Sequence, residues 1–466
     1  MDLERFRTVR LMTFTSKPQD DPFLRGPLGQ SAFADDAVRA EYLELTYGSL
    51  RVAAEDVSGV AGLPARTTLS RHAPSQSLFD YQVDLAEQMQ EIVEDRRRPA
   101  RALLALPTGA GKTRTAMSAV LGLIRAGKIE KALWLAPSRE LLDQGYETLV
   151  SLWRADLRCP TLEVLRCHAI GGLPKCDGRA VYFATPQMLS RRLARGGAAP
   201  HDWGLTVFDE AHQAVAPSFG RAFLAAERGN TGVAASIGLS ATPGRRDDAS
   251  TDDLVSLFAS RLLKSHLLSP NPIEVLTKCG VLAALEFCPI EVAHRVIGQR
   301  QVLSASEHLR EPWEHLDWDL GRFSAVVKAI LDCDSRSRSL VFAGSIAHAN
   351  AIGCALRGCG RNVGVLTSNT PLPERGRLVE DFRAGRIVTL VNKSILATGF
   401  DVPGLSGIFL ATVIGSPILF EQMVGRASRG PAVGGLPSAI IWQLDDHLAI
   451  HGRPASYYRF RDFDWS

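Results

Sequence analysis

Short apolar runs alternate with longer helical patterns along one stretch of this chain, which starts near Phe79. Short runs that are mostly apolar, and end in polar or turn residues, are typical of strands buried on both faces of a parallel sheet. Strands that alternate with helices predict an α/β domain. The five runs of this first stretch are Arg101–Leu106, Ala132–Leu135, Val181–Ala184, Leu205–Phe208 and Ala235–Leu239.

The same alternation returns after an irregular interval that extends from about Ser269 to Leu320. The second stretch begins with the helical pattern Arg322–Leu331 and continues with five apolar runs: Ser339–Phe342, Val363–Leu366, Ile387–Val391, Gly407–Leu410 and Ala439–Trp442. We therefore expect two tandem α/β domains, each an open, mostly parallel sheet with helices on both faces. The expected organisation is an N-terminal extension (1–78), a first domain (79–270), a connecting segment (271–319) and a second domain (320–466).

The composition is that of an ordinary folded protein. Hydrophobic residues make up 45% of the chain and charged residues 22%, and no apolar run approaches the roughly 18–20 residues that a membrane helix needs. The N-terminus lacks the apolar stretch of a signal peptide, so we expect no membrane partner and a cytoplasmic location. The eight cysteines are scattered without a CxxC pair and are expected to be reduced thiols. The net charge of +3 leaves a nucleic-acid partner open, because basic residues can gather in one groove.

A glycine-rich loop stands between the first expected strand and the helical pattern that follows it. The segment Leu106–Thr113 reads LPTGAGKT, with Leu106 where the phosphate-loop pattern has glycine. Glycines let backbone N–H groups approach phosphates closely, while Lys112 can reach the β- and γ-phosphates and the Thr113 hydroxyl can bind Mg²⁺. An ordinary glycine-rich turn would not need lysine and threonine in register at the helix start. The residues expected to contact the nucleotide here are Pro107, Thr108, Gly109, Ala110, Gly111, Lys112 and Thr113.

Two adjacent acids follow another apolar run further along the chain. The segment Val207–His212 reads VFDEAH. Asp209 is the candidate for holding Mg²⁺, and Glu210 is the candidate general base that polarises the attacking water. Two acids after a strand are common in solvated loops, so the pair indicates a catalytic site only in combination with the phosphate loop upstream. Together the two motifs predict ATP and Mg²⁺ as cofactors and hydrolysis of ATP as the reaction.

Further motifs, in order along the chain, resemble those of superfamily 2 helicases of the DEAH type. Tyr81 and Gln82 resemble the upstream glutamine motif that reads adenine. Segments that resemble helicase motifs Ia, Ib, III, V and VI are, in turn, Ala136–Gln144, Ala184–Leu189, Ser240–Thr242, Ala397–Pro403 and Gln422–Arg429. Within the superfamily, Leu268–Ala283 and Asp445–Pro454 resemble segments that flank the second domain in the XPB-like and type III restriction helicase-like group.

This resemblance implies two RecA-like domains that couple ATP hydrolysis to movement along nucleic acid. It implies that motifs Ia and Ib touch the nucleic-acid backbone and that motif III couples hydrolysis to binding. It also implies that Gly399 and Asp401 of motif V help to form the nucleotide site. Arg426 and Arg429 of motif VI would act on the γ-phosphate as catalytic arginines, a role worth about 10³–10⁵ in rate in characterised enzymes.

The motifs leave the nucleic acid and the cellular role open. The DEAH form and the restriction-like flanking segments favour a helicase or translocase that acts on DNA, and the alternative is an RNA helicase. A motor subunit of a larger repair, restriction or phage-defence complex, with little activity alone, is a further alternative. In that case a partner protein or nuclease could bind through the N-terminal extension.

Overall fold

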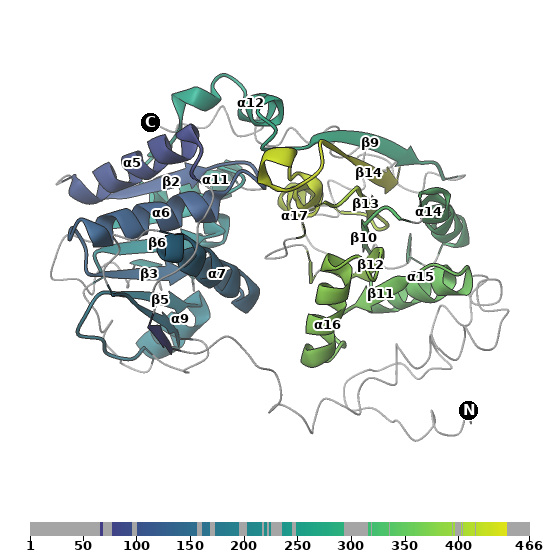
Figure 1. The fold of residues 1–466 in the computed structure, drawn as a ribbon, viewed down its shortest axis with the longest axis horizontal. Coiled ribbons are helices and arrows are strands. Elements are labelled where there is room, and N and C mark those ends of the chain that lie inside the picture. The colour runs from purple at the N-terminus through teal and green to yellow at the C-terminus, as the bar shows by residue number, and fades with distance from the viewer. Residues whose placement is uncertain are drawn as a thin grey trace. The chain divides into compact units, whose positions relative to one another are not determined.

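The computed structural model divides, at Cys279 and Gly280, into two α/β units (Figure 1), called here the first and the second domain. The structure describes residues 66–68, 77–95, 100–155, 161–167, 173–194, 203–216, 219–220, 223–224, 235–244, 248–292, 316–317, 319–334, 336–393, 395–396, 402, 404–414 and 416–444. Within these residues, no helix is both long and apolar enough to span a bilayer. The seven cysteines that fall in them are all free thiols.

The first domain is built on an eight-stranded sheet with the strand order β1-β4-β5-β3-β6-β7-β2-β8. All neighbours run parallel except β1 and β4. The strands are β1 Arg66–Thr68, β2 Arg101–Ala105, β3 Lys131–Leu135, β4 Glu163–Arg166, β5 Ala180–Ala184, β6 Leu205–Asp209, β7 Ala235–Ser240 and β8 Leu262–Leu263. The five predicted runs are therefore confirmed as β2, β3, β5, β6 and β7. The additional strands are short and extend both ends of the sheet.

Helices connect these strands and bury apolar faces. They are α5 Asp80–Glu94, α6 Lys112–Arg125, α7 Arg139–Ala155, α9 Pro186–Ala194, α11 Asp248–Leu257 and α12 Pro272–Lys278, with the 3₁₀ turns η3 Ala211–Gln213 and η4 His266–Leu268. In α6, the buried residues Met117, Val120 and Ile124 recur at helical spacing. Every residue of β5, β6 and β7 is buried, and a fully buried large apolar side chain contributes roughly 1.5–3 kcal/mol. The sheet is thus a packed support for the loops at its carboxyl edge.

The second domain contains a six-stranded, all-parallel sheet in the order β11-β12-β10-β13-β14-β9. Its strands are β9 Ala284–Ile290, β10 Ser339–Phe342, β11 Val363–Leu366, β12 Thr389–Asn392, β13 Gly407–Leu410 and β14 Ser438–Leu444. Its helices are α14 Leu320–Asp332, α15 Ile346–Gly358, α16 Leu372–Arg383 and α17 Pro417–Val424, with the 3₁₀ turns η6 Gly425–Ala427 and η7 Pro431–Val433. The five predicted runs and the predicted helix at Arg322–Leu331 are confirmed.

Helices cover both faces of this second sheet. Leu340 and Phe342 of β10 pack into one apolar cluster with residues of α16 and α17, whereas Val341 packs into another with residues of α14 and α15. Successive side chains of a strand point to opposite faces, so the two clusters are the two sides of the sheet. The predicted fold class, two open α/β domains with helices on both faces, is confirmed.

Strand β9 lies where the sequence placed part of a connecting segment. It pairs in parallel with β14 along seven residues, from Ala284 opposite Ser438 to Ile290 opposite Leu444. Its exposed positions follow no simple alternation, so no periodic signal marked it as a strand. The interval 271–319 also contains α12, and the boundary between the structural units falls at Cys279 and Gly280.

Candidate functional site

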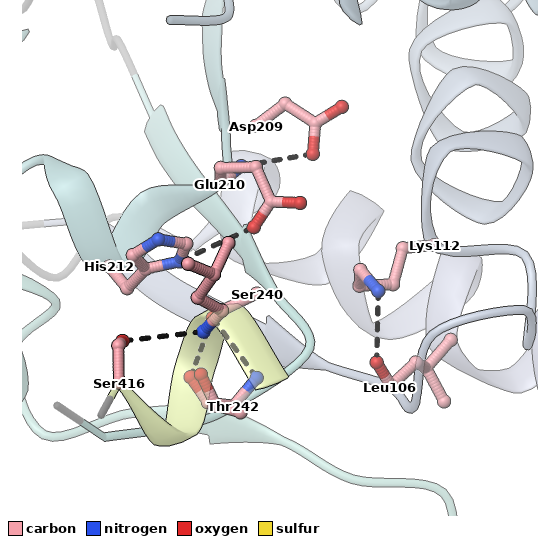
Figure 2. A network of polar contacts seen from close by, with 9 residues as sticks. Leu106, Lys112, Asp209, Glu210, His212, Ser240, Thr242 and Ser416 are labelled. Atoms are coloured by element: carbon pink, nitrogen blue, oxygen red, sulfur yellow. Dashed lines mark hydrogen bonds and ion pairs between the residues drawn. The ribbon is translucent and has the colours of Figure 1, made fainter. Parts of the chain in front are cut away.

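Three of the motifs follow three adjacent strands of the first sheet. Strand β7 lies between β6 and β2. In the sheet register, Asp209 at the end of β6 pairs with Leu239 of β7, and Ser240 at the end of β7 pairs with Ala105 at the end of β2. Parallel neighbours place their carboxyl ends at one edge, where α/β proteins bind ligands. The glycine-rich loop, the acid pair and Ser240 therefore meet at this edge, as Figure 2 shows.

The glycine-rich loop takes a backbone shape that requires glycine. Gly109 and Gly111 have φ of 89° and 82°, in the left-handed region that L side chains rarely adopt. Gly111 is the N-cap of α6. Leu106, which departs from the phosphate-loop pattern, is buried, and its N–H donates to the Ser240 carbonyl at 3.3 Å. It therefore ends the strand and fills the core, and the anion-binding part of the loop begins after it.

Lys112 is the first residue of α6 and curves back over the loop. Its Nζ donates to the Leu106 carbonyl oxygen at 3.1 Å (Figure 2). A lysine at a helix N-terminus, surrounded by backbone N–H groups, forms a site for anions because its charge adds to the positive end of the helix dipole. The loop therefore has the charge and the geometry to receive phosphates.

Tyr81 and Gln82, the predicted adenine motif, both contact the glycine-rich loop directly. The Tyr81 hydroxyl donates to the Ala110 carbonyl at 2.8 Å, and Gln82 Nε2 donates to the same oxygen at 3.3 Å. Gln82 Oε1 accepts the N–H of Phe79 at 3.1 Å, and a Cβ on Gly111 would lie only 2.4 Å from Gln82 Nε2. Burial raises the pKa of Tyr81, which keeps its hydroxyl protonated as a donor. These two side chains therefore brace the loop.

Asp209 is a buried carboxylate surrounded by groups suited to a divalent cation. Burial raises the pKa of Asp209 to about 7, and the neighbouring Glu210 carboxylate adds to this rise, whereas Lys112 and the Thr113 hydroxyl oppose it. Mg²⁺ prefers one or two carboxylates together with hydroxyl, water and phosphate oxygens. Asp209 and Thr113 supply such oxygens beside the loop, so the residues present fit Mg²⁺ bound with a nucleotide. A bound cation would favour the ionised form of Asp209.

Glu210 has a strained backbone that turns its side chain away from the strand. Its φ of 54° and ψ of 50° are left-handed, a conformation that costs a non-glycine residue about 1–3 kcal/mol and is concentrated at functional sites. Its N–H donates to Asp209 Oδ1 at 3.0 Å, and its Oε2 lies 3.3 Å from His212 Nδ1 (Figure 2). The turn therefore presents two adjacent carboxylates in different directions, one beside the loop and one beside His212.

The turn after β7 is closed by its own side chains. Ser240 Oγ donates to the Thr242 carbonyl at 2.5 Å and accepts the Thr242 N–H at 3.2 Å. Both residues are buried, and Thr242 Oγ1 has no hydrogen-bond partner within the described part of the chain. A buried hydroxyl without a partner costs free energy, so this one is available for a ligand or a water molecule.

Motifs Ia and Ib follow β3 and β5 at the same edge of the sheet. Ser138 Oγ accepts the Leu141 N–H at 3.3 Å at the start of α7, and Thr185 Oγ1 accepts the Met188 N–H at 3.3 Å at the start of α9. Gln187 Nε2 donates to the Pro137 carbonyl at 3.5 Å and links the two loops. Two helix N-termini at one edge present N–H groups of the kind that bind phosphates.

The residues predicted from motifs V and VI belong to the second domain. Arg426 lies in η6, and its Nε donates to the Gln422 carbonyl at 3.2 Å. Arg429 follows and forms an antiparallel backbone bridge with Leu282. The sequence did not predict this bridge, because no local pattern links positions so far apart in the chain. Gly399 and Asp401 lie outside the described residues.

Two protein-family models match the chain, one in each domain. The model described as "Type III restriction enzyme, res subunit" matches residues 75–245, and the model described as "Helicase conserved C-terminal domain" matches residues 321–430. Together these matches cover more than half of the 466 residues. They contain every predicted site residue, from Tyr81 to Arg429.

Curated relatives align with most of the chain at low identity. A Halobacterium salinarum protein named "Putative DNA 3'-5' helicase Rad25" is 26% identical over 450 residues, which cover 91% of this chain and 67% of that protein. A protein of the same name in Haloarcula marismortui is 26% identical and covers 90% of this chain and 60% of its own length. "Putative ATP-dependent helicase IRC3" of Saccharomyces cerevisiae is 26% identical over 76% of this chain and 49% of its own. The chain thus spans between about half and two thirds of these relatives.

Two solved structures are similar in fold to this one. Dbp5 of S. cerevisiae, bound to RNA and ADP BeF3, aligns with a TM-score of 0.51 and 18% identity over 92% of this chain and 93% of that chain. The type ISP restriction-modification enzyme LlaBIII, bound to DNA, aligns with a TM-score of 0.56 and 16% identity over 79% of this chain and 28% of that chain. At such identities the likeness concerns the fold, which is that of two RecA-like domains. The chain belongs to the superfamily 2 helicases, a family of ATP-hydrolysing enzymes, with a domain of the type III restriction subunit followed by a helicase C-terminal domain.

Proposed function

We propose that this protein is an ATP-dependent helicase or translocase that acts on DNA and uses Mg²⁺ with ATP. The observation that carries the proposal is the meeting of the glycine-rich loop, the Asp209–Glu210 pair and the Ser240 turn at the carboxyl edge of one sheet. The names of the relatives, which include DNA helicases, support DNA as the nucleic acid. A cytoplasmic location and a partner protein bound through residues 1–78 are parts of this proposal that rest on the sequence alone.

In this proposal the first domain binds and activates the nucleotide. The backbone N–H groups of the glycine-rich loop and Lys112 hold the phosphates, while Tyr81 and Gln82 keep the loop in place and contribute to the adenine site. Asp209 and Thr113 hold Mg²⁺, which supplies charge neutralisation at the β- and γ-phosphates. Glu210, oriented by its contact with His212, accepts a proton from the attacking water.

The second domain contributes positive charge during hydrolysis. Arg426 and Arg429 neutralise charge that grows on the γ-phosphate in the transition state. They belong to the other structural unit, so they help only when nucleic acid and ATP draw the two domains together. Gly399 and Asp401 of motif V complete the nucleotide site in this proposal.

Replacing Arg426 or Arg429 with alanine is expected to spare ATP binding, which the first domain mostly supplies. We expect turnover stimulated by nucleic acid to fall at least ~10²-fold, the lower side of what catalytic arginines supply elsewhere. Basal turnover should change less. The measurement is the ratio of stimulated to basal ATPase for each variant. If both variants retain the wild-type ratio, the site is completed by another group, such as a partner subunit.

The test of the nucleic acid itself is a parallel ATPase assay with single-stranded DNA, duplex DNA, single-stranded RNA and duplex RNA. We expect stimulation by DNA to exceed stimulation by RNA. The affinity should fall steeply as salt rises, because contacts with backbone phosphates release counterions. Stimulation by RNA that equals or exceeds that by DNA would favour the RNA helicase alternative. Stimulation by none of the four would favour the motor-subunit alternative.

A further inference from the structure

The backbone of motif VI is paired with the segment by which the chain enters the second domain. The Ala283 N–H donates to the Ser428 carbonyl at 2.8 Å, the Gly430 N–H to the Val281 carbonyl at 2.9 Å, and the Ala432 N–H to the Gly280 carbonyl at 2.9 Å. Leu282 and Arg429 form the antiparallel bridge between these bonds. We call residues 280–283 and 428–432 the connector clamp.

The central residues of the connector clamp are buried and closely packed. Val281, Leu282 and Ala283 are each less than 5% exposed, so its backbone bonds are shielded from water and costly to leave unmade. A Cβ on Gly430 would lie 2.2 Å from the Gly280 carbonyl oxygen, an approach that only glycine permits. Gly280 itself has φ of +70°, in the left-handed region where glycine is favoured. The clamp therefore depends on two glycines.

On the first-domain side of the connector clamp, no residue lies between the hydrogen-bonded structure of α12 and the clamp itself. The Cys279 N–H donates to the Val275 carbonyl of α12 at 2.9 Å, so the helix is hydrogen-bonded up to the last residue of the first domain. The next residue, Gly280, already accepts a bond from Ala432 in the clamp. Two adjacent residues thus belong to bonded structures in different domains.

We infer that the connector clamp positions the motif VI arginines for catalysis, by tying the backbone of Arg429 to the junction at Cys279 and Gly280. This inference rests on the proposed catalytic role of Arg426 and Arg429. A hinge absorbs domain motion in a few backbone angles, and here the hinge is the peptide that joins α12 to the clamp. A rotation about this junction moves the arginine segment with it, because the paired backbones cannot shift independently. Val281 and Leu282 are positioning residues in this arrangement, since they act through Arg429.

Gly430→Ala is the variant that breaks the clamp without changing either arginine, because its Cβ would displace the Gly280 carbonyl. Gly376→Ala is the control in the same domain, since Gly376 is exposed on α16, has no left-handed φ, and nothing lies within 4 Å of a Cβ there. We expect Gly430→Ala to lower the DNA-stimulated kcat about 10²-fold, as a misplacement near 1 Å does in other enzymes. The KM for ATP and the basal rate should remain within about twofold of the wild type. Gly376→Ala should retain the wild-type ratio of stimulated to basal rate.

A second pair of variants tests the inferred role of the connector clamp if Gly430→Ala does not fold. Two glycines inserted between Cys279 and Gly280 leave the clamp bonds intact but add flexible residues at the hinge. The control is the same insertion between the exposed residues Gly127 and Lys128. The hinge insertion should lower the stimulated kcat at least tenfold, and the control insertion should not, since surface loops tolerate extra residues. An unchanged DNA-stimulated kcat in folded Gly430→Ala, or in the hinge insertion, would contradict the inferred role of the clamp. It would not contradict the proposed helicase function. A wild-type protein without stimulation by nucleic acid would remove the proposed function and the clamp's role with it.

Discussion

Turnover of ATP by the Lys112→Ala protein is expected to be at least ~10³-fold below that of the wild type, the upper range for loss of one preorganised charged donor. Lys112 is the only charged residue of the loop LPTGAGKT, and its Nζ already lies over the loop at the Leu106 carbonyl. Its removal takes away the charge that holds the β- and γ-phosphates. It also removes the cation that lowers the pKa of Asp209, so this pKa should rise and Mg²⁺ should bind more weakly.

The measurement for Lys112→Ala is steady-state phosphate release with saturating DNA, together with a nucleotide-binding titration, which should show weaker binding. Lys128→Ala is the matched control. Lys128 is half exposed and pairs with Glu94 at 3.2 Å, and such surface pairs are worth little. Its turnover should equal that of the wild type. A purified, folded Lys112→Ala protein with near wild-type turnover would refute the assignment of the ATP site to this loop.

Glu210→Gln is expected to retain ATP binding and to slow hydrolysis about 10²–10⁴-fold, the range for loss of a general base. Glutamine keeps the size and the polar character of the side chain but cannot accept the proton from water. Asp209 and Thr113 remain to hold Mg²⁺, so the nucleotide should stay bound. The variant should therefore accumulate an ATP-bound complex on DNA. Such accumulation would show that the slowed step is the chemical step and not nucleotide binding.

Single-turnover hydrolysis, started with ATP bound in excess enzyme, separates the chemical step from product release and is the measurement for Glu210→Gln. Glu94→Gln is the matched control, because it makes the same chemical change at the exposed end of α5. Its single-turnover rate should be that of the wild type. A normal rate in Glu210→Gln would show that another group activates the water.

The strands and the local motifs of this protein could be predicted because each is a property of a short segment. Runs such as Val181–Ala184 and Leu340–Phe342 are apolar throughout, and the structure buries them on both faces of parallel sheets. Gly109 and Gly111 stand where the loop needs left-handed backbone. Strand β9 escaped prediction because it is an edge strand, and its mixed exposure leaves no period to detect.

Leu106 is a motif position whose role could not be predicted from the motif alone. The phosphate-loop pattern has glycine at this position, and the sequence alone could not say what a leucine does there. In the structure its side chain belongs to the core and its N–H bonds to the strand that carries Ser240. The position therefore serves packing, which depends on β7 as a neighbour and not on the loop itself.

The sequence by itself determined the fold class, the order of the motifs and the chemistry that their side chains can perform, because these depend on residue type and short-range periodicity. Only the tertiary structure decided which motifs meet: the insertion of β7 between β2 and β6, the brace from Tyr81 and Gln82 to Ala110, and the pairing of Gly280–Ala283 with motif VI. These contacts join residues far apart in the chain, and each uses a backbone group as donor or acceptor. Backbone groups are the same in every residue, so their long-range partners leave no mark in the sequence.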